Sequence, residues 1–228
     1  MPFTLAHPAA ALPLARRLWL PGLVAGSIAP DTPYYLPTGV NGELTHSMLG
    51  LPVDLALGVA LLALGCVLHR PALALLGKSA TPPRTSWWRG AAAIAVGALT
   101  HLAWDAFTHT DGAAVRHWGL MRESVAGPHR VYNVIGYLSS LGGLLVLGWF
   151  GARRYRRAEP GPPVPQRNWV LGGLVLAASA GALIAGTDPI VEVSLYDCVR
   201  HLLVAAIQSA AIVFIAWALA NSLRRRSG

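Results

Sequence analysis

Charged side chains are scarce in this chain. Asp, Glu, Lys and Arg make up 12% of the 228 residues, whereas hydrophobic residues make up 54% and the mean hydropathy is +0.49. A soluble domain has about 25% charged residues, so an ordinary soluble fold is excluded. The composition instead predicts one integral membrane domain over residues 1–228, built as an all-α helical bundle.

Cysteine is also scarce. The two cysteines, Cys66 and Cys198, have no CxxC partners, so neither a disulfide framework nor a cysteine zinc knuckle is expected. The amino terminus lacks the basic region of a signal peptide, and His7 and several prolines interrupt any apolar core there. A cysteine-based site and a cleaved secretory leader are therefore not expected.

The net charge of +8 does not indicate nucleic acid as a partner, because the basic residues lie in short blocks between apolar runs. Such blocks orient membrane helices with their basic ends in the cytoplasm. The basic segments are residues 69–89, 152–168 and the carboxyl-terminal tail, whereas residues 187–197 are acidic. The predicted location is the bacterial inner membrane, with the lipid bilayer as partner and residues 1–50 and 110–131 on the outer side.

Five apolar stretches have roughly the 20 residues that a bilayer-spanning helix needs. The expected spans are residues 51–68, opened by His46 and Ser47, then 90–109, 132–151, 169–186 and 198–220. Residues 1–50 are broken by proline and glycine, which predicts a loop over 32–43 and two short helices that pack on the bundle or lie at the membrane interface. The parts of the domain are an N-terminal metal-site segment (1–50), core spans (51–151), a basic Pro-rich linker (152–168) and C-terminal spans (169–228).

The segment Thr100–His109, at the end of the second expected span, carries the most informative polar residues. His101, Asp105 and His109 are spaced four residues apart, so on a helix they share one face. Asp54 lies inside the first span. Ionisable groups at membrane depth are costly and usually face the bundle interior with a partner, which marks these residues as candidates for function.

Three more side chains can reach this helix if the N-terminal helices fold back on the outer end of the bundle. His7 follows the opening residues, Asp31 follows a sharp Ala-Pro turn, and His46 lies at the outer end of the first span. Imidazole and carboxylate groups bind zinc-like or manganese-like ions. We expect one or two divalent ions, zinc first and manganese as the alternative. The predicted ligands are His7, Asp31, His46, His101, Asp105 and His109.

Each residue also has an interpretation without a metal. Asp31 suits a helix cap or a turn after proline, and His46 lies in a helix-capping region. His101 and Asp105 can satisfy each other across one helical turn, and Asp54 can pair with a histidine or an arginine. A second pair with four-residue spacing, Asp197 and His201, lies near the outer end of the fifth span. It is interpreted as lying beside the metal site and not as one of its ligands.

The motifs and their order resemble a known family. The chain contains, in this order, MPFTLAHPAA at 1–10, GSIAPD at 26–31, THSMLG at 45–50 and GALTHLAWDAFTH at 97–109, followed by YNVIGYLSSLGG at 132–143. This set resembles a bacterial membrane family called domain of unknown function 4184. It is also similar to the membrane-bound metal-dependent hydrolases of bacterial inner membranes, and more distantly to the helical zinc-dependent phospholipase C proteins. The resemblance implies a helical metal site built from His7, Asp31, His46, His101 and Asp105, and His109 matches the nearest family.

Together these features predict a membrane-bound metal-dependent hydrolase that acts on phosphoesters or lipid-like substrates. The metal would lower the pKa of a water molecule, and Asp54, or an aspartate that does not bind the metal, would be the general base for its attack. Two alternatives stay open: a non-catalytic membrane protein with a structural metal or polar His/Asp cluster, and an ion or proton transporter. The absence of an internal repeat counts against the transporter.

Overall fold

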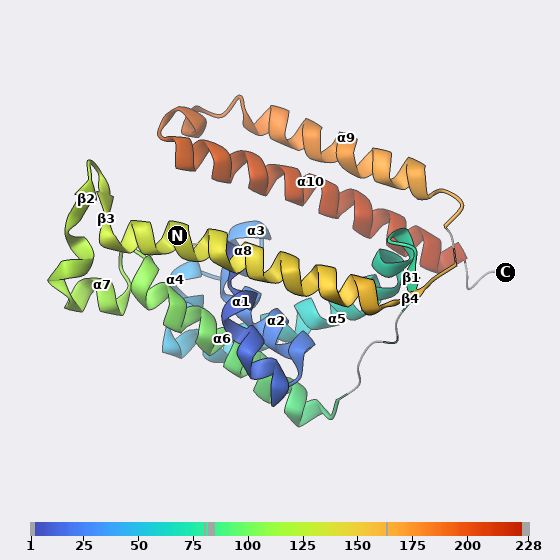
Figure 1. Ribbon diagram of the computed structural model, residues 1–228, viewed down its shortest axis with the longest axis horizontal. Helices are drawn as coiled ribbons and strands as arrows, with labels where there is room; N and C mark the ends of the chain where they lie inside the picture. Colours follow the sequence, from blue (N-terminus) through green and yellow to red (C-terminus); the bar gives the residue numbers. More distant parts are fainter. Residues whose placement is uncertain (1–2, 80, 82–84, 163, 225–228) are drawn as a thin grey trace. The chain divides into compact units, whose positions relative to one another are not determined.

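The structure is a computed structural model that describes residues 3–79, 81, 85–162 and 164–224, almost entirely as helices (Figure 1). Within these residues, five helices are long and apolar enough to cross a bilayer. The predicted all-α fold with five spans is confirmed. The five helices are α5 (Leu51–Leu75), α6 (Trp87–Thr108), α8 (Val131–Arg157), α9 (Arg167–Ala185) and α10 (Leu195–Arg224). Some residues of the opening motif, the basic loop and the tail lie outside the described residues: Met1, Pro2, Arg84, Arg225 and Arg226.

The chain divides into two compact units, and α5 runs from one into the other. The first unit comprises the described residues within Met1–Gly65 and Pro82–Arg157, and the second those within Cys66–Thr81 and Ala158–Gly228. In the second unit α9 and α10 form an antiparallel hairpin through η6 (Pro189–Glu192), and β1 (Lys78–Ser79) pairs with β4 (Glu159–Pro160). The first unit contains the polar cluster described below.

The N-terminal segment contains more helices than the sequence predicted. They are η1 (Thr4–Ala6), α1 (Pro8–Ala11), η2 (Leu12–Arg16), α2 (Leu20–Ile28), η3 (Ala29–Asp31), α3 (Thr32–Tyr35), α4 (Gly42–Thr45) and η4 (Met48–Gly50). The expected loop over residues 32–43 is therefore wrong at both ends. Pro33 lies in the first turn of α3, a position that proline fits because its missing N–H is not needed there.

The start of the first span also differs from the prediction. His46 ends α4, and α5 begins only at Leu51. Between them the Ser47 hydroxyl accepts a hydrogen bond from the Gly50 N–H at 3.2 Å, which closes the turn of η4. A Cβ atom at Gly50 would lie 2.0 Å from the Leu44 carbonyl oxygen, so the chain folds tightly here because position 50 has no side chain. This turn, rather than a continuous helix, directs the His46 ring toward the interior.

Helix α2 packs on α6 with their backbones almost in contact. A Cβ atom at Gly26 would lie 1.9 Å from the Ile94 carbonyl oxygen, and one at Gly97 would lie 2.3 Å from the Leu23 carbonyl oxygen. Leu23 packs there against Ala11 and Ala93, and these three buried residues form the apolar core of this part. Close helix approach through small residues is the usual mode of packing in membranes. It brings the end of α2, and the residues that follow it, against the middle of α6.

Replacing Gly97 with alanine is therefore expected to destabilise the protein by about 1–3 kcal/mol, the usual cost of overpacking. The added methyl group would meet backbone atoms of Leu23 and Ser27, which cannot move without displacing α2. Thermal unfolding in detergent measures the effect. Gly90→Ala on the same helix is the control, since its nearest atom is 3.6 Å away, and the intrinsic helix preference for alanine predicts a gain of about 0.5–1 kcal/mol. Equal stability of the two variants would contradict the close packing of α2 on α6.

Between α6 and α8 the chain is not the plain loop expected over 110–131. It contains α7 (Ala113–His117), η5 (Gly119–Arg122) and a small hairpin of β2 (Ser124–Ala126) with β3 (His129–Arg130). Gly127 turns the hairpin with a φ of 53°, a conformation that favours glycine.

Candidate metal centre

Helix α6 supplies two buried polar side chains from successive turns. His101 is fully buried and Asp105 is 6% exposed, so the predicted shared face points into the protein. The His101 Nε2 atom lies 3.3 Å from Asp105 Oδ2. His109 follows as the C-cap of α6 and is only partly buried. Its ring centroid is 6.4 Å from that of His46, so it lies at the margin of the cluster.

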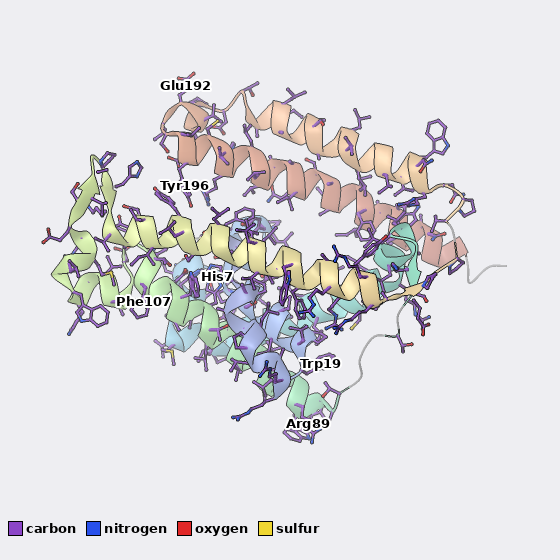
Figure 2. The ribbon with its side chains drawn as sticks, in the orientation of Figure 1. His7, Trp19, Arg89, Phe107, Glu192 and Tyr196 are labelled. Carbon is purple, nitrogen blue, oxygen red and sulfur yellow. The ribbon has the colours of Figure 1, made fainter. Side chains whose placement is uncertain are left out.

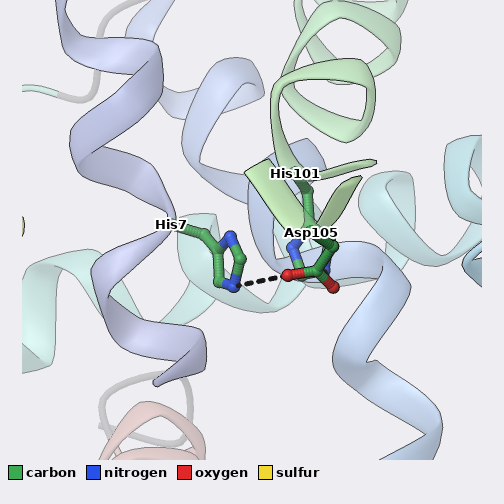
Figure 3. A group of neighbouring side chains, drawn as sticks. All are labelled: His7, His101 and Asp105. Atoms are coloured by element: carbon green, nitrogen blue, oxygen red, sulfur yellow. Dashed lines mark ion pairs between the residues drawn. The ribbon is translucent and has the colours of Figure 1, made fainter. Parts of the chain in front are cut away.

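Three breaks in the N-terminal segment supply the other side chains. His7 lies between η1 and α1, Asp31 ends η3, and His46 ends α4. His7 and Asp31 are buried, and the side chain of His46 is 15% exposed. Each of these residues lies at the end of, or next to, a short helix, and its side chain contacts a residue of α6. In Figure 3 the His7 ring points toward the carboxylate of Asp105, and His101 lies just behind this pair.

The ligand-type atoms of the five residues converge on one small volume. His46 Nε2 lies 3.2 Å from Asp31 Oδ1 and 3.5 Å from Asp105 Oδ2. His101 Nε2 lies 3.3 Å from His46 Nε2 and 3.7 Å from Asp31 Oδ1. His7 Nε2 lies 3.8 Å from Asp105 Oδ1, and the His7 ring stacks on that of His101 at 3.9 Å. The structure therefore brings together five of the six residues that the sequence predicted as metal ligands.

Backbone carbonyl groups determine which nitrogen of two rings faces the cluster. His101 Nδ1 donates to the Ser27 carbonyl oxygen at 2.8 Å, and His46 Nδ1 donates to the Gly42 carbonyl oxygen at 2.8 Å. A carbonyl oxygen only accepts, so both Nδ1 atoms carry hydrogen, and in the neutral rings the Nε2 lone pairs face the cluster. This is the outer arrangement typical of metal-binding histidines. Two Nε2 lone pairs 3.3 Å apart repel each other, and either a proton on one ring or a bound metal ion removes that repulsion.

The electrostatics favour the metal-binding protonation states of His7 and Asp31, but not that of His46. Burial, with repulsion from His101 as the next cause, lowers the pKa of His7 to about 4, so its ring is neutral at pH 7. Burial alone would raise the pKa of Asp31, but hydrogen bonds from His46 and Thr4 and the charge of His101 lower it to about 2. Burial likewise lowers the pKa of His46, and its contacts with Asp31 and Gly42 outweigh this and raise it. A metal would therefore compete with a proton mainly at His46.

Several buried polar atoms in the cluster and beside it have no hydrogen-bond partner among the described residues. They are both ring nitrogens of His7, both carboxylate oxygens of Asp105 and both of Asp54. Buried polar atoms are normally paired, and unpaired ones indicate a missing ion or water. Asp54, in the first turn of α5, is fully buried and interacts electrostatically with His46 and His101. It thus lies near the cluster without being one of its contacts.

Two overlapping groups of three residues have the spacing to hold a metal ion. His7, His101 and Asp105 form one group, and Asp31, His46 and His101 form the other, with the ligand atoms of each group within 4.8 Å of one another. Both groups contain only nitrogen and carboxylate oxygen donors, the set that zinc and manganese accept. The residues fit a divalent metal, and two groups that share His101 leave room for one ion or two.

Some residues that shape this cluster were not found from the sequence. Thr45 is fully buried and donates from its hydroxyl to the Pro30 carbonyl oxygen at 2.8 Å, which ties the residues beside Asp31 and His46 together. The position of Thr45 next to a candidate ligand was the only signal for this role. In the second unit, His201 lies 3.6 Å from Asp188, whereas Asp197 accepts a hydrogen bond from Ser194 at 2.6 Å.

The fold and this cluster define a class: a multi-pass helical membrane protein with a buried His/Asp cluster capable of holding a metal ion. The family model described as "Domain of unknown function (DUF4184)" matches residues 1–224, so the chain belongs to this family. The match also covers the C-terminal third, where the sequence motifs gave no signal. No curated protein and no solved structure matches the chain.

Proposed function

We propose that this protein is a membrane-bound metal-dependent hydrolase that acts on phosphoesters or lipid-like substrates. The observation that supports the proposal most strongly is the pair of Nε2 atoms of His46 and His101, 3.3 Å apart and directed at two carboxylates by backbone hydrogen bonds. When both rings are neutral, these two Nε2 atoms present lone pairs that would bind a cation, and their Nδ1 hydrogen bonds are the outer contacts usual for metal-binding histidines. When the rings are protonated, the same Nε2 atoms would donate to Asp31 and Asp105, which is the polar network without a metal.

In this proposal His7, Asp31, His46, His101 and Asp105 hold one or two divalent ions, with zinc the first choice. His109, at the margin of the cluster, completes the proposed set when the ring moves inward. The bound ion supplies Lewis acidity, which lowers the pKa of water and polarises an ester or phosphoester oxygen. Asp54 serves as the general base, because its buried carboxylate accepts no hydrogen bond from the described residues and is therefore available to accept a proton.

The proposed location of the site is the outer face of the bacterial inner membrane. The cluster lies toward the C-terminal end of α6, and α8 starts on that side and runs back to a basic last turn with Arg154, Arg156 and Arg157. Basic helix ends favour the cytoplasm. The cluster, at the other end of these helices, would then face outward, near the level of lipid headgroups.

A structural metal site is the second candidate. It is favoured by the low exposure of the cluster, since only His46 has a side chain with more than a tenth of its surface exposed among the five residues. A closed metal site with four protein ligands holds structure, whereas a catalytic site keeps one position open for water. The partly exposed edge at His46 is where such a position would have to be.

Purified protein in detergent is expected to hydrolyse a chromogenic phosphodiester such as bis(p-nitrophenyl) phosphate. The rate should fall at least tenfold after treatment with a chelator and return with added zinc or manganese. Undiminished hydrolysis by metal-free protein would refute a metal-dependent reaction. Tightly held metal with no hydrolysis of phosphodiester or carboxylic ester probes would instead support the structural site.

A further inference from the structure

A cavity of about 450 Å³ lies in the first unit, between α1, α6 and α8. Its volume lies in the range of about 300–1,000 Å³ that is typical of small-ligand sites. Its walls are mainly apolar and include Ala10 from α1, Ala103, Trp104 and Phe107 from α6, and Ile135 from α8. Phe107 projects from α6, and His7 lies just before α1 (Figure 2). None of the five cluster residues lines the cavity, so it is a separate feature.

The few polar groups on these walls already have partners. The Thr108 hydroxyl donates to the Trp104 carbonyl oxygen at 3.0 Å, and the Thr100 hydroxyl to the Gly97 carbonyl oxygen at 2.7 Å. The Trp104 indole N–H donates to the Ser139 hydroxyl at 3.3 Å. A water molecule needs about two to four polar partners to be stable in a cavity, and these walls offer it little. The cavity therefore favours hydrocarbon.

The cavity and the cluster lie on adjacent faces of the same two turns of α6. At about 100° and about 1.5 Å per residue, Thr100 to Thr108 spans about 12 Å and includes both His101 and Asp105. Trp104 and Thr108 lie on the border between the two faces. On α1, Ala10 lines the cavity one turn after His7, and the Ala10 N–H donates to the His7 carbonyl oxygen. A chain in the cavity would thus lie within about one helical turn of the cluster.

We infer that this cavity holds one acyl chain of a membrane lipid whose ester or phosphoester group is presented to the His/Asp cluster. The inference rests on the proposed hydrolase function and specifies its substrate as lipid. The membrane is the source of the chain, because α6 and α8 are both of membrane-spanning length and the medium around them is hydrocarbon. The hydrophobic effect does not favour one hydrocarbon environment over another, so the shape of the cavity provides the selectivity.

The test uses a phospholipid with a photoreactive diazirine at the end of one acyl chain, added to the full-length protein in detergent. After irradiation, labelled residues are located by mass spectrometry. In the wild type, labelling within residues 100–108 and 135–139 should saturate and be displaced by unlabelled phospholipid. Ala103→Phe fills the cavity and should reduce this labelling at least fivefold. Ala92→Phe, the same change at an exposed position of α6 away from the cavity, should leave it unchanged.

A second variant, Ile135→Trp, fills the cavity from α8, so the test can still be made if Ala103→Phe does not fold. Bound metal and elution volume are measured for each variant as checks of the fold. The inference would be overturned if labelling rises linearly with lipid concentration, spreads evenly over the lipid-facing helices and is unchanged in both filling variants. This holds even if phosphodiester hydrolysis persists. Saturable labelling that both filling variants abolish would support it, even if the protein hydrolyses nothing, in which case the proposed function fails alone.

Discussion

Replacing both His101 and Asp105 with alanine is expected to remove the bound metal, with a fall of at least tenfold in metal per protein. These two residues supply the α6 part of both candidate groups, since His101 belongs to each and Asp105 approaches His7, His46 and His101. Losing even an outer partner of a metal ligand typically costs about 10–100-fold in metal affinity, and here two ligands are lost. Elemental analysis of protein purified without added metal measures the change.

The matched control is Asp188→Ala/His201→Ala, which removes another His/Asp pair with a separation of 3.6 Å. That pair is partly exposed and lies in the second unit, so the metal content should stay at the wild-type level. Asp105→Asn provides a milder test, because the amide keeps the size of the side chain and loses its negative charge. Wild-type metal content in the His101/Asp105 double variant would mean that the cluster is a polar network that holds the helices together and not a metal site.

Asp54→Asn is expected to lower kcat for ester hydrolysis by about 10²–10⁴-fold, the usual contribution of a general base. Metal content should not change, because Asp54 belongs to neither metal group. Thermal stability should stay the same or rise. The wild-type carboxylate is buried at membrane depth without a hydrogen-bond partner among the described residues, and a neutral amide is less costly in that place. Steady-state kinetics, elemental analysis and thermal unfolding on one preparation measure the three quantities.

Asp111→Asn is the control for Asp54→Asn, since Asp111 is an exposed acid just after α6. Its kcat should match that of the wild type. If Asp54→Asn hydrolyses at the wild-type rate, another group accepts the proton and the role proposed for Asp54 is wrong. If it loses metal as well as activity, Asp54 is a ligand and not a base.

The part of the site on α6 was predictable because it is local. Residues four apart lie on one face of a helix in any environment. Charged residues are rare on the buried face of a membrane helix, and those that occur there are usually functional. His101 and Asp105 satisfied both conditions in the sequence. Asp54 was noticed only because a charged residue is costly inside a membrane span. Its burial could therefore be expected, but its lack of a hydrogen-bond partner among the described residues could not.

The N-terminal part was harder to predict, because short helical turns have weak sequence signals. Proline and glycine were interpreted as marking a loop over 32–43, whereas Pro33 lies in the first turn of α3 and Gly42 begins α4. His46 was expected to open the first span, but it ends α4 and is held by the Gly42 carbonyl group. Such turns depend on hydrogen bonds to backbone groups. Those groups lie either far away in the sequence or within the turn itself.

The sequence by itself determined a multi-pass helical membrane chain, five helices of spanning length and a shared face for His101 and Asp105, because hydropathy and helical period are properties of neighbouring residues. Only the tertiary structure decided that His7, Asp31 and His46 join that face. Ser27 lies 74 residues before His101, and His46 lies 55 residues before it. Such distant groups meet because Gly26 and Gly97 let α2 and α6 touch at the backbone, and that contact is a matter of packing between helices, which no local pattern records.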